Sequence, residues 1–218
     1  MDLQEIKDAL ENSDPQQRMR GIRELRNYEA DVAAPLLLNK VKDSEFLVRS
    51  FVAMGLGKKR SAEAFAALLE MMKSDSDPNV RSEAANSLSY YGDSAVSHLR
   101  QMYEVDSHWL IRRSIIAALA DLNALQELLE ICVIGLSGDD EAVMESCIGC
   151  LGLFPDTEQQ EPALRLLLSF VEDESWRIRI QVAKSLGKYD AEQATAALNK
   201  LKTDENHQVV GAVLESLM

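Results

Sequence analysis

Aromatic residues and helix-breaking residues are both scarce in this sequence. Phe, Trp and Tyr make up 6% of the 218 residues, and the chain has only 5 prolines and 10 glycines. Together with frequent Leu, Ala, Glu and Ser, this composition favours helix. No long stretch lacks apolar residues, so the sequence does not have the composition of a disordered chain.

Positive charge is also in short supply. The 23 basic residues are outnumbered by 36 acidic ones, which gives a formal charge of −13. Such a surface repels nucleic acid phosphates and anionic lipid headgroups. The densest basic cluster is Arg18, Arg20, Arg23 and Arg26, which we interpret as a solvated helix face beside acidic neighbours. We therefore expect no nucleic acid partner.

Long apolar runs and a disulfide framework are absent too. No apolar run approaches the roughly 18 residues that a membrane span needs. The acidic start, Met-Asp-Leu-Gln-Glu, does not read as a secretory signal, and the three cysteines are an odd number inside predicted helices. We therefore expect a cytoplasmic protein without a membrane span.

A repeated phrase is the strongest feature present. An acidic turn is followed by an apolar residue, then Arg, then small and apolar residues, then Leu, as in Asp43–Arg49 and Asp173–Arg179. The Arg or its substitute, which we call the marker, stands at positions 18, 49, 81, 112, 144, 179 and 210. Seven copies at spacings of 31 to 35 residues predict a repeat architecture.

The apolar pattern around each marker predicts a helix. Small or apolar residues stand four positions after every marker and a leucine stands seven after, on one helical stripe. Each marker segment is therefore the second helix of a pair, and the first helices are expected at 3–11, 32–42, 62–73, 94–104, 124–136, 160–172 and 191–202. Asp14-Pro15 and Ser76-Asp77-Pro78 provide a capping side chain and a proline at helix starts.

These helix pairs predict an all-α fold, a right-handed α-solenoid in which each pair buries its apolar face against its neighbours. We expect a single repeat domain over residues 1–218. Its seven repeats would span roughly residues 1–28, 29–60, 61–92, 93–123, 124–155, 156–190 and 191–218.

The pattern resembles HEAT repeats, and its short form resembles the phycobilisome-lyase-type HEAT-like family. The segments that carry the resemblance are Val48-Arg49 to Leu56-Gly57 and Ile178-Arg179 to Leu186-Gly187. The resemblance covers essentially the whole chain. It implies kinship with bilin lyase and isomerase subunits of cyanobacterial antennae, with an antenna-degradation protein and with adaptors.

The recurring Arg on a core-facing stripe needs a recurring acceptor, because an unpaired buried charge is costly. We predict a structural ladder in which each Arg bridges turn carboxylates and helix ends, with Asp75 as an alternative to Asp77. Its predicted members are Asp43, Arg49, Asp77, Arg81, Asp106, Arg112, Asp173 and Arg179.

The cysteines are the first place to look for chemistry. Cys147 and Cys150 form a Cys-x-x-Cys within one helix, and Cys132 lies on the partner helix of the same repeat. Three thiolates are candidate ligands for zinc or an iron–sulfur centre. However, Cys147 and Cys150 fill positions held by apolar or small residues in other repeats. We therefore interpret them as small core residues, and we expect no metal.

Large side chains on the second helices are the candidate partner-binding residues. Aromatic residues stand three positions before three of the markers, where they either plug the joint between repeats or anchor a partner on the concave face. Other apolar or basic residues occupy outward positions of the same helices. The predicted partner-binding residues are Phe46, Phe51, Met54, Trp109, Arg113, Trp176, Arg177 and Ile180.

Two stretches depart from the repeat. The fifth repeat has Met144 at its marker and is followed by a long connection, 154–160, where we expect a change in superhelical curvature or a hinge. The last repeat ends at Leu217-Met218 without a polar cap, which suggests that a partner or self-association covers this end.

Three functions remain open at this point. The first is a non-catalytic scaffold or adaptor that grips another protein along its concave face without a cofactor. The resemblance implies a phycobiliprotein or linker as that partner. The second, also implied by the resemblance, is a bilin lyase or isomerase subunit holding a phycocyanobilin-type tetrapyrrole, with Trp109, Arg112 and Arg113, or Trp176 and Arg177, against it. The third is an adaptor in iron–sulfur or metal cofactor assembly, using the three cysteines.

Overall fold

The computed structural model describes residues 1–217 as helices and short connections. This part of the chain contains fourteen α-helices and two 3₁₀-helices, and no strand. The predicted all-α fold is therefore confirmed. The helices form two compact units, residues 1–122 and 123–217 of the described chain.

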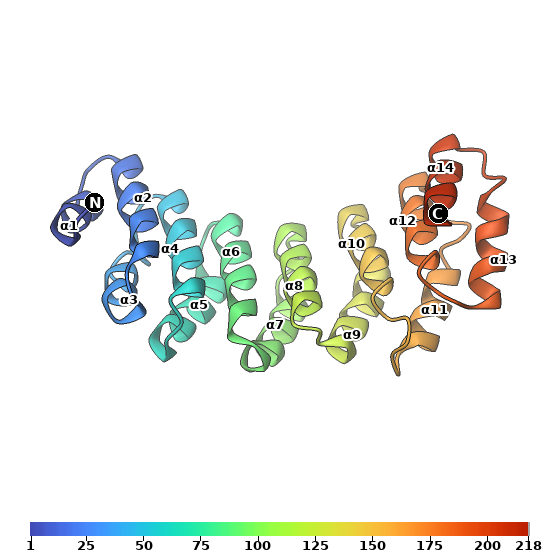
Figure 1. Cartoon of the computed structure of the whole chain (residues 1–218), viewed down its shortest axis with the longest axis horizontal. Helices are drawn as coiled ribbons and strands as arrows, with labels where there is room; N and C mark the ends of the chain where they lie inside the picture. Colours follow the sequence, from blue (N-terminus) through green and yellow to red (C-terminus); the bar gives the residue numbers. More distant parts are fainter. Residues whose placement is uncertain (218) are drawn as a thin grey trace. The chain divides into compact units, whose positions relative to one another are not determined.

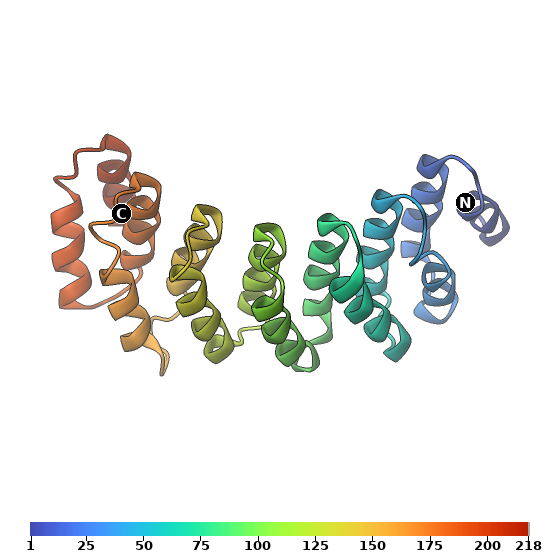
Figure 2. The same ribbon diagram turned by 180° about the vertical axis from the view of Figure 1, so that it is seen from behind.

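The N-terminal unit contains four helix pairs. They are α1 (Leu3–Leu10) with α2 (Pro15–Glu24), α3 (Ala30–Leu38) with α4 (Phe46–Lys58), α5 (Ala62–Ser74) with α6 (Pro78–Leu88), and α7 (Asp93–Val105) with α8 (Trp109–Asp121). The 3₁₀-helices η1 (Leu25–Asn27) and η2 (Ser89–Tyr91) extend α2 and α6. The second helices α2, α4, α6 and α8 pack in succession and form one layer (Figure 1), which Figure 2 shows from behind.

The C-terminal unit contains three more pairs. They are α9 (Leu125–Leu136) with α10 (Glu141–Leu151), α11 (Gln160–Leu168) with α12 (Trp176–Leu186), and α13 (Glu192–Leu201) with α14 (His207–Ser216). Within this unit α10 packs on α12 and α12 on α14. The seven predicted helix pairs are thus all present, while the handedness of the solenoid stays a prediction.

The helix starts follow from local sequence. Asp14 and Asp77 each accept a hydrogen bond from the backbone N–H two residues on, at 2.9 and 2.8 Å, with Pro15 and Pro78 at the first helical positions. Such caps satisfy N–H groups that have no partner inside the helix. The predicted helix starts at Asp14-Pro15 and Asp77-Pro78 are confirmed.

The core follows the predicted stripe in the first six repeats. The leucines seven positions after the marker are at most 1% exposed in those repeats, as at Leu56 and Leu186. In the last repeat the residues four and seven positions after the marker, Leu214 and Leu217, are 56% and 53% exposed. The self-association predicted from this end stays a prediction, and Met218 lies outside the described residues.

The connection 154–160 is the extended joint that the spacing predicts, because α10 ends at Leu151 and α11 begins at Gln160. The two compact units do not divide there. They divide one repeat earlier, after Leu122, where Asn123 adopts a positive φ of 53°.

Candidate functional site

A ladder of arginine–aspartate pairs joins successive turns within each unit. The Nε and Nη2 atoms of Arg49 donate to the two carboxylate oxygens of Asp75 at 2.7 and 2.8 Å. Arg18 makes the same two-bond contact with Asp43, and Arg179 makes it with Asp204. Arg81 Nε donates to Asp106 at 2.9 Å. Each pair links residues 25 or 26 positions apart, so each step joins one repeat to the next.

The same arginines also bind the turn before their own helix. Arg49 Nη1 donates to the carbonyl oxygens of Asp43 and Ser44 at 2.8 and 3.3 Å, and Arg18, Arg81 and Arg179 repeat this contact at their own turns. The arginine side chains of the four pairs are only 10% to 17% exposed. Paired and hydrogen-bonded to both turns, these buried charges fix each turn to its neighbour.

The carboxylate partners differ from the predicted ones in several places. Asp77 is not a ladder residue: its carboxylate caps α6, and Asp75 binds Arg49 instead. The physical reason is register, since the ladder aspartate stands six positions before the marker in every turn that has one. This spacing also identifies Asp204, which the sequence reasoning missed.

Two predicted ladder members have other contacts. Arg112 Nε donates to its own turn at the carbonyl of Asp106, and its guanidinium lies 5.1 Å from the ring centre of Tyr103. The carboxylate of Asp173 accepts the N–H of Ser175 at 2.9 Å. In the fifth repeat the aspartate position holds Gly138 and the marker is Met144, so this repeat supplies neither an acceptor nor an arginine.

Arg18 also corrects the interpretation of the basic cluster. It is 8% exposed and belongs to the ladder, whereas Arg20, Arg23 and Arg26 are exposed on the surface. The prediction of a solvated face is therefore wrong for Arg18, because its marker position faces the turns.

The ladder predicts acid sensitivity. Burial raises the pKa of Asp43 and Asp75. The hydrogen bonds from Arg18 and Arg49, those from the backbone N–H groups of Glu45 and Asp77, and the nearby positive charges together outweigh it, so both pKa values lie below the ordinary one. The hydrogen bond from Arg179 likewise lowers the pKa of Asp204. A lowered folded-state pKa stabilises the protein above the unfolded-state pKa of about 4 and stops doing so as the pH falls through the folded value. We expect the free energy of unfolding, measured in urea, to fall below about pH 4, and to fall less steeply in Asp75→Asn.

Tyrosine hydroxyls form a second set of links that the sequence reasoning missed. Tyr91 donates to the carbonyl of Leu56 at 2.9 Å, and Tyr189 donates to that of Leu151 at 2.5 Å. Burial raises the pKa of both tyrosines, so they remain protonated donors. Aromatic residues ten positions after four of the markers, Tyr28, Tyr91, Phe154 and Tyr189, are the signal in the sequence. These links fix the far ends of the second helices.

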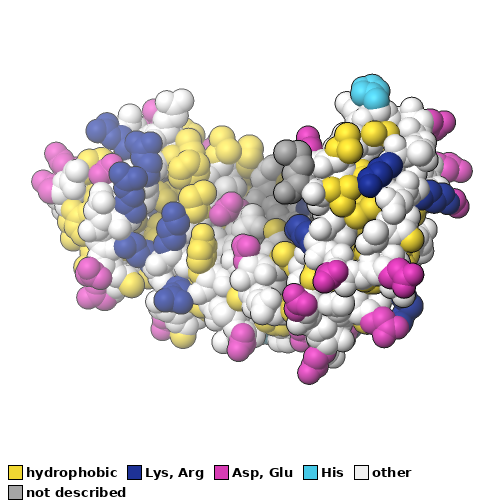
Figure 3. Space-filling model, turned by 45° about the vertical axis from the view of Figure 1, so that its right-hand side comes forward, with side chains coloured by type: hydrophobic (Ala, Val, Ile, Leu, Met, Phe, Trp, Pro, Cys, Tyr) yellow, Lys and Arg dark blue, Asp and Glu magenta, His cyan; other side chains and the backbone are white. Residues whose placement is uncertain are grey.

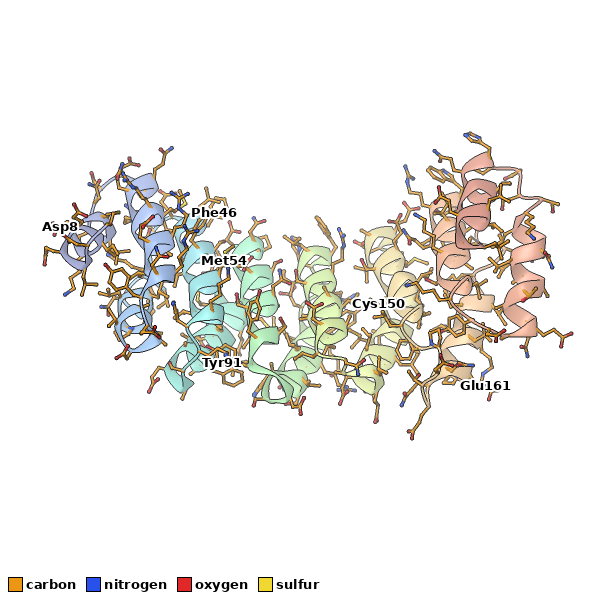
Figure 4. All side chains as sticks on the ribbon, in the orientation of Figure 1. Asp8, Phe46, Met54, Tyr91, Cys150 and Glu161 are labelled. Carbon is orange, nitrogen blue, oxygen red and sulfur yellow. The ribbon has the colours of Figure 1, made fainter. Side chains whose placement is uncertain are left out.

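The predicted partner-binding residues of the N-terminal unit lie on α4 and α8. Phe46 and Phe51 are half-buried, whereas Met54 is 40% exposed. Figure 4 shows Phe46 near the start of α4 and Met54 farther along the same helix. Trp109 is 42% exposed, stacks on His108 at 6.0 Å and lies 5.8 Å from the Arg113 guanidinium. Trp109 thus lies partly on the surface, and its role as a partner anchor stays a prediction.

A pocket of about 300 Å³ lies between α2, α3 and α4. We call it the α2–α4 pocket. Its apolar part includes Phe51 and Met54, two of the predicted residues. Its full lining consists of Ile22, Arg23, Leu25, Arg26, Leu37, Phe51, Met54, Gly55, Lys58 and Lys59. Figure 3 shows Lys and Arg side chains gathered beside apolar ones over the N-terminal helices.

The remaining predicted residues belong to the C-terminal unit. The Arg177 guanidinium lies 4.8 Å from the ring centre of Trp176, and Nη1 lies 3.9 Å from the Glu141 carboxylate. Trp176 and Ile180 are half-buried. The structure thus places the predicted set in two groups, one in each unit.

The cysteines lie mainly in the core. Cys132 and Cys147 are fully buried, Cys150 is partly exposed, and all three are free thiols. A hydrogen bond with Cys147 and burial raise the pKa of Cys132 well above its ordinary value, which disfavours the reactive thiolate. Within residues 1–217 no group of three or more His, Cys, Asp or Glu side chains is arranged to hold a metal ion. None of the helices in this range combines the length and apolarity needed to cross a bilayer.

Comparison with known proteins identifies the repeat. A family model described as HEAT repeats matches residues 34–120 and 125–218. No curated protein matches the sequence.

Solved structures share the fold at low identity. YibA of Escherichia coli is 15% identical with a TM-score of 0.68, covering 97% of this chain and 80% of its own. The complex of CpcE and CpcF of phycocyanin lyase from Nostoc sp. PCC7120 is 17% identical with a TM-score of 0.57, covering 100% and 95%. An engineered protein is 16% identical with a TM-score of 0.56, covering 100% and 68%. At these identities the likeness is one of fold.

Proposed function

The chain belongs to the HEAT-repeat family, and from that premise we propose that it is a non-catalytic scaffold that binds another protein through its second helices. The observation that carries the proposal is the set of large apolar side chains exposed on these helices in the N-terminal unit. Leu47, Met54 and Trp109 are 48%, 40% and 42% exposed. Exposed apolar groups on a folded surface mark interaction sites when they gather on one face.

The ladder supports the same proposal because it makes the binding surface rigid. Arg–Asp pairs and tyrosine hydroxyls hold the helix pairs of each unit at both ends of their second helices. A surface that is already ordered loses little conformational entropy on binding. Exposed Trp109 is then the best candidate for a hot spot, because Trp is enriched among residues that dominate binding energy.

The nature of the partner is a finer part of the proposal. We propose a phycobiliprotein or an associated linker, supported by the short-repeat resemblance and by the likeness of fold to the phycocyanin lyase complex. A tetrapyrrole held by the scaffold is the alternative form of this proposal, and it has a distinct readout in visible absorbance.

The test is an affinity capture from a cyanobacterial lysate with the chain as bait. We expect phycobiliproteins or linkers to be captured, and Trp109→Ala to weaken that binding by about 2 kcal/mol, or about 30-fold, as for a hot-spot residue. The matched control is Val105→Ala, because Val105 is 74% exposed but lies at the end of the first helix α7.

Equal capture by wild type and Trp109→Ala would contradict binding through the second helices. Capture of other proteins alone would be compatible with a scaffold but would contradict a phycobiliprotein or linker as its partner. Absorbance of a bilin on the bait itself, without a captured protein, would favour the tetrapyrrole form.

A further inference from the structure

We propose that the α2–α4 pocket binds an acidic segment of the partner protein and takes one large apolar side chain of that segment into its apolar floor. This inference rests on the proposed function and names the chemistry of the segment. The pocket joins an apolar floor to a basic rim, and each part has its own evidence.

The floor is apolar and preformed. Ile22, Leu25 and Leu37 are at most 4% exposed, so their positions are fixed by the core behind them. Phe51 and Met54 line the same pocket from α4. At about 300 Å³ the pocket is at the small end of ligand sites, which suits a single large side chain rather than a cofactor.

Gly55 lines the pocket without a side chain. A Cβ atom at this position would lie 2.9 Å from Leu37 Cδ1, closer than such atoms approach. Gly55 therefore allows α3 and α4 to meet closely at the pocket.

The rim carries positive charge that the protein itself does not neutralise. Arg23 and Arg26 are exposed, and neither forms an ion pair with any carboxylate in the described part of the chain. Lys59 is already engaged, since its ammonium donates to the carbonyl oxygens of Arg26 and Tyr28. Lys58 has the carboxylate of Glu83 in its electrostatic surroundings. Arg23 and Arg26 are therefore two cations of the rim that no carboxylate of residues 1–217 pairs with.

Helix ends explain part of this charge. Arg23 lies in the last turn of α2 and Arg26 in the following η1, where the helix dipole favours a cation. The dipole does not explain why both arginines line an open apolar pocket, three positions apart at the end of α2 and in η1. Carboxylates next to an apolar side chain match this arrangement, since Arg pairs with carboxylates through two parallel hydrogen bonds.

An acidic peptide segment fits better than the other polyanions. Nucleic acid presents many phosphates over a long surface, and the charge of −13 repels it outside the small basic rim. A short segment needs only the rim itself. A second copy of this acidic chain is the remaining alternative, and concentration dependence separates it from a peptide.

The test uses the full chain with ¹³C-labelled methionine methyl groups and a synthetic peptide. The probe is a short acetylated peptide of Glu and Asp around one central Phe. We expect its addition to shift the Met54 methyl resonance, while the buried Met102 methyl, in α7, stays unchanged. Replacing the central Phe with Ser, or the acidic residues with Lys, is expected to abolish the shift.

Charge reversal provides the matched variants. Arg23→Glu and Arg26→Glu are each expected to weaken peptide binding about tenfold, because they place like charges in contact. Lys73→Glu is the control, with the same change in net charge at an exposed position of α5. Unchanged thermal unfolding would show that each variant is folded.

Three results would overturn the proposal: no Met54 shift with the Phe peptide, equal binding of the Lys peptide, or a Met54 shift that depends on protein concentration without any peptide. The last would assign the pocket to a second copy. If the Met54 shift is absent while Trp109→Ala still loses its captured partner, the pocket proposal is wrong and the scaffold proposal is supported. If Trp109→Ala captures the partner as wild type does, the capture experiment by itself contradicts the scaffold proposal.

Discussion

Replacing Asp75 with alanine is expected to lower the free energy of unfolding of the N-terminal unit by about 3–5 kcal/mol, the cost of leaving one partner of a buried ion pair alone. Asp75 accepts two bonds from Arg49, whose side chain is only 12% exposed. Its carbonyl oxygen also accepts a bond from Arg81, and its carboxylate accepts the N–H of Asp77. Without the carboxylate, the buried guanidinium of Arg49 has no charged partner, and the turn at Asp75 loses its hydrogen bond to the N–H of Asp77. Urea unfolding at neutral pH measures the effect.

Asp77→Ala is the matched control for this prediction. Asp77 stands two residues away and caps α6 through the N–H of Asn79, so its removal is expected to cost about 1 kcal/mol. Replacing both Arg49 and Asp75 with apolar residues of similar size is expected to cost less than Asp75→Ala alone, because no charge is then left buried. Equal losses for Asp75→Ala and Asp77→Ala would contradict the special role of the ladder.

Gly57→Ala is expected to destabilise the same unit by about 2 kcal/mol, although alanine is the better helix former. Gly57 lies inside α4, and φ is positive at no glycine of residues 1–217 except Gly92. Gly57 therefore does not serve as a left-handed helix cap. Its role is close approach: a Cβ atom there would lie 2.8 Å from Ser87 Cβ and 3.1 Å from Ser87 Cα. Thermal or urea unfolding measures the cost.

Two further variants separate packing from helix propensity. Ser87→Gly removes the opposing Cβ and is expected to recover much of the loss when combined with Gly57→Ala. Gly211→Ala is the control, because nothing lies within 4 Å of a Cβ at Gly211 in α14. It is expected to stabilise the C-terminal unit by up to about 1 kcal/mol. A gain from Gly57→Ala as well would show that α4 and α6 have room to move apart.

The helix pairs were determined by the sequence itself. Residues four and seven positions after each marker share a face of any helix, and caps such as Asp14-Pro15 act within a few residues. The stripe and the caps each involve residues close together in the sequence, and the stripe occurs seven times. They therefore predicted the fold class and the helix starts. The same pattern predicted that Phe51 and Met54 lie near the surface of α4, because helical position depends only on spacing.

Tertiary structure decided which groups meet. The partner of Arg49 is Asp75 rather than Asp77, and this depends on how one turn stacks on the next, 26 positions along the chain. The α2–α4 pocket likewise forms only where α2, α3 and α4 come together, so that Arg26, Leu37 and Met54 line the same pocket. Helical spacing is fixed by local backbone geometry and can be read along the sequence. The closeness of two turns or three helices is set by the packing of side chains distant in sequence, which no local pattern contains.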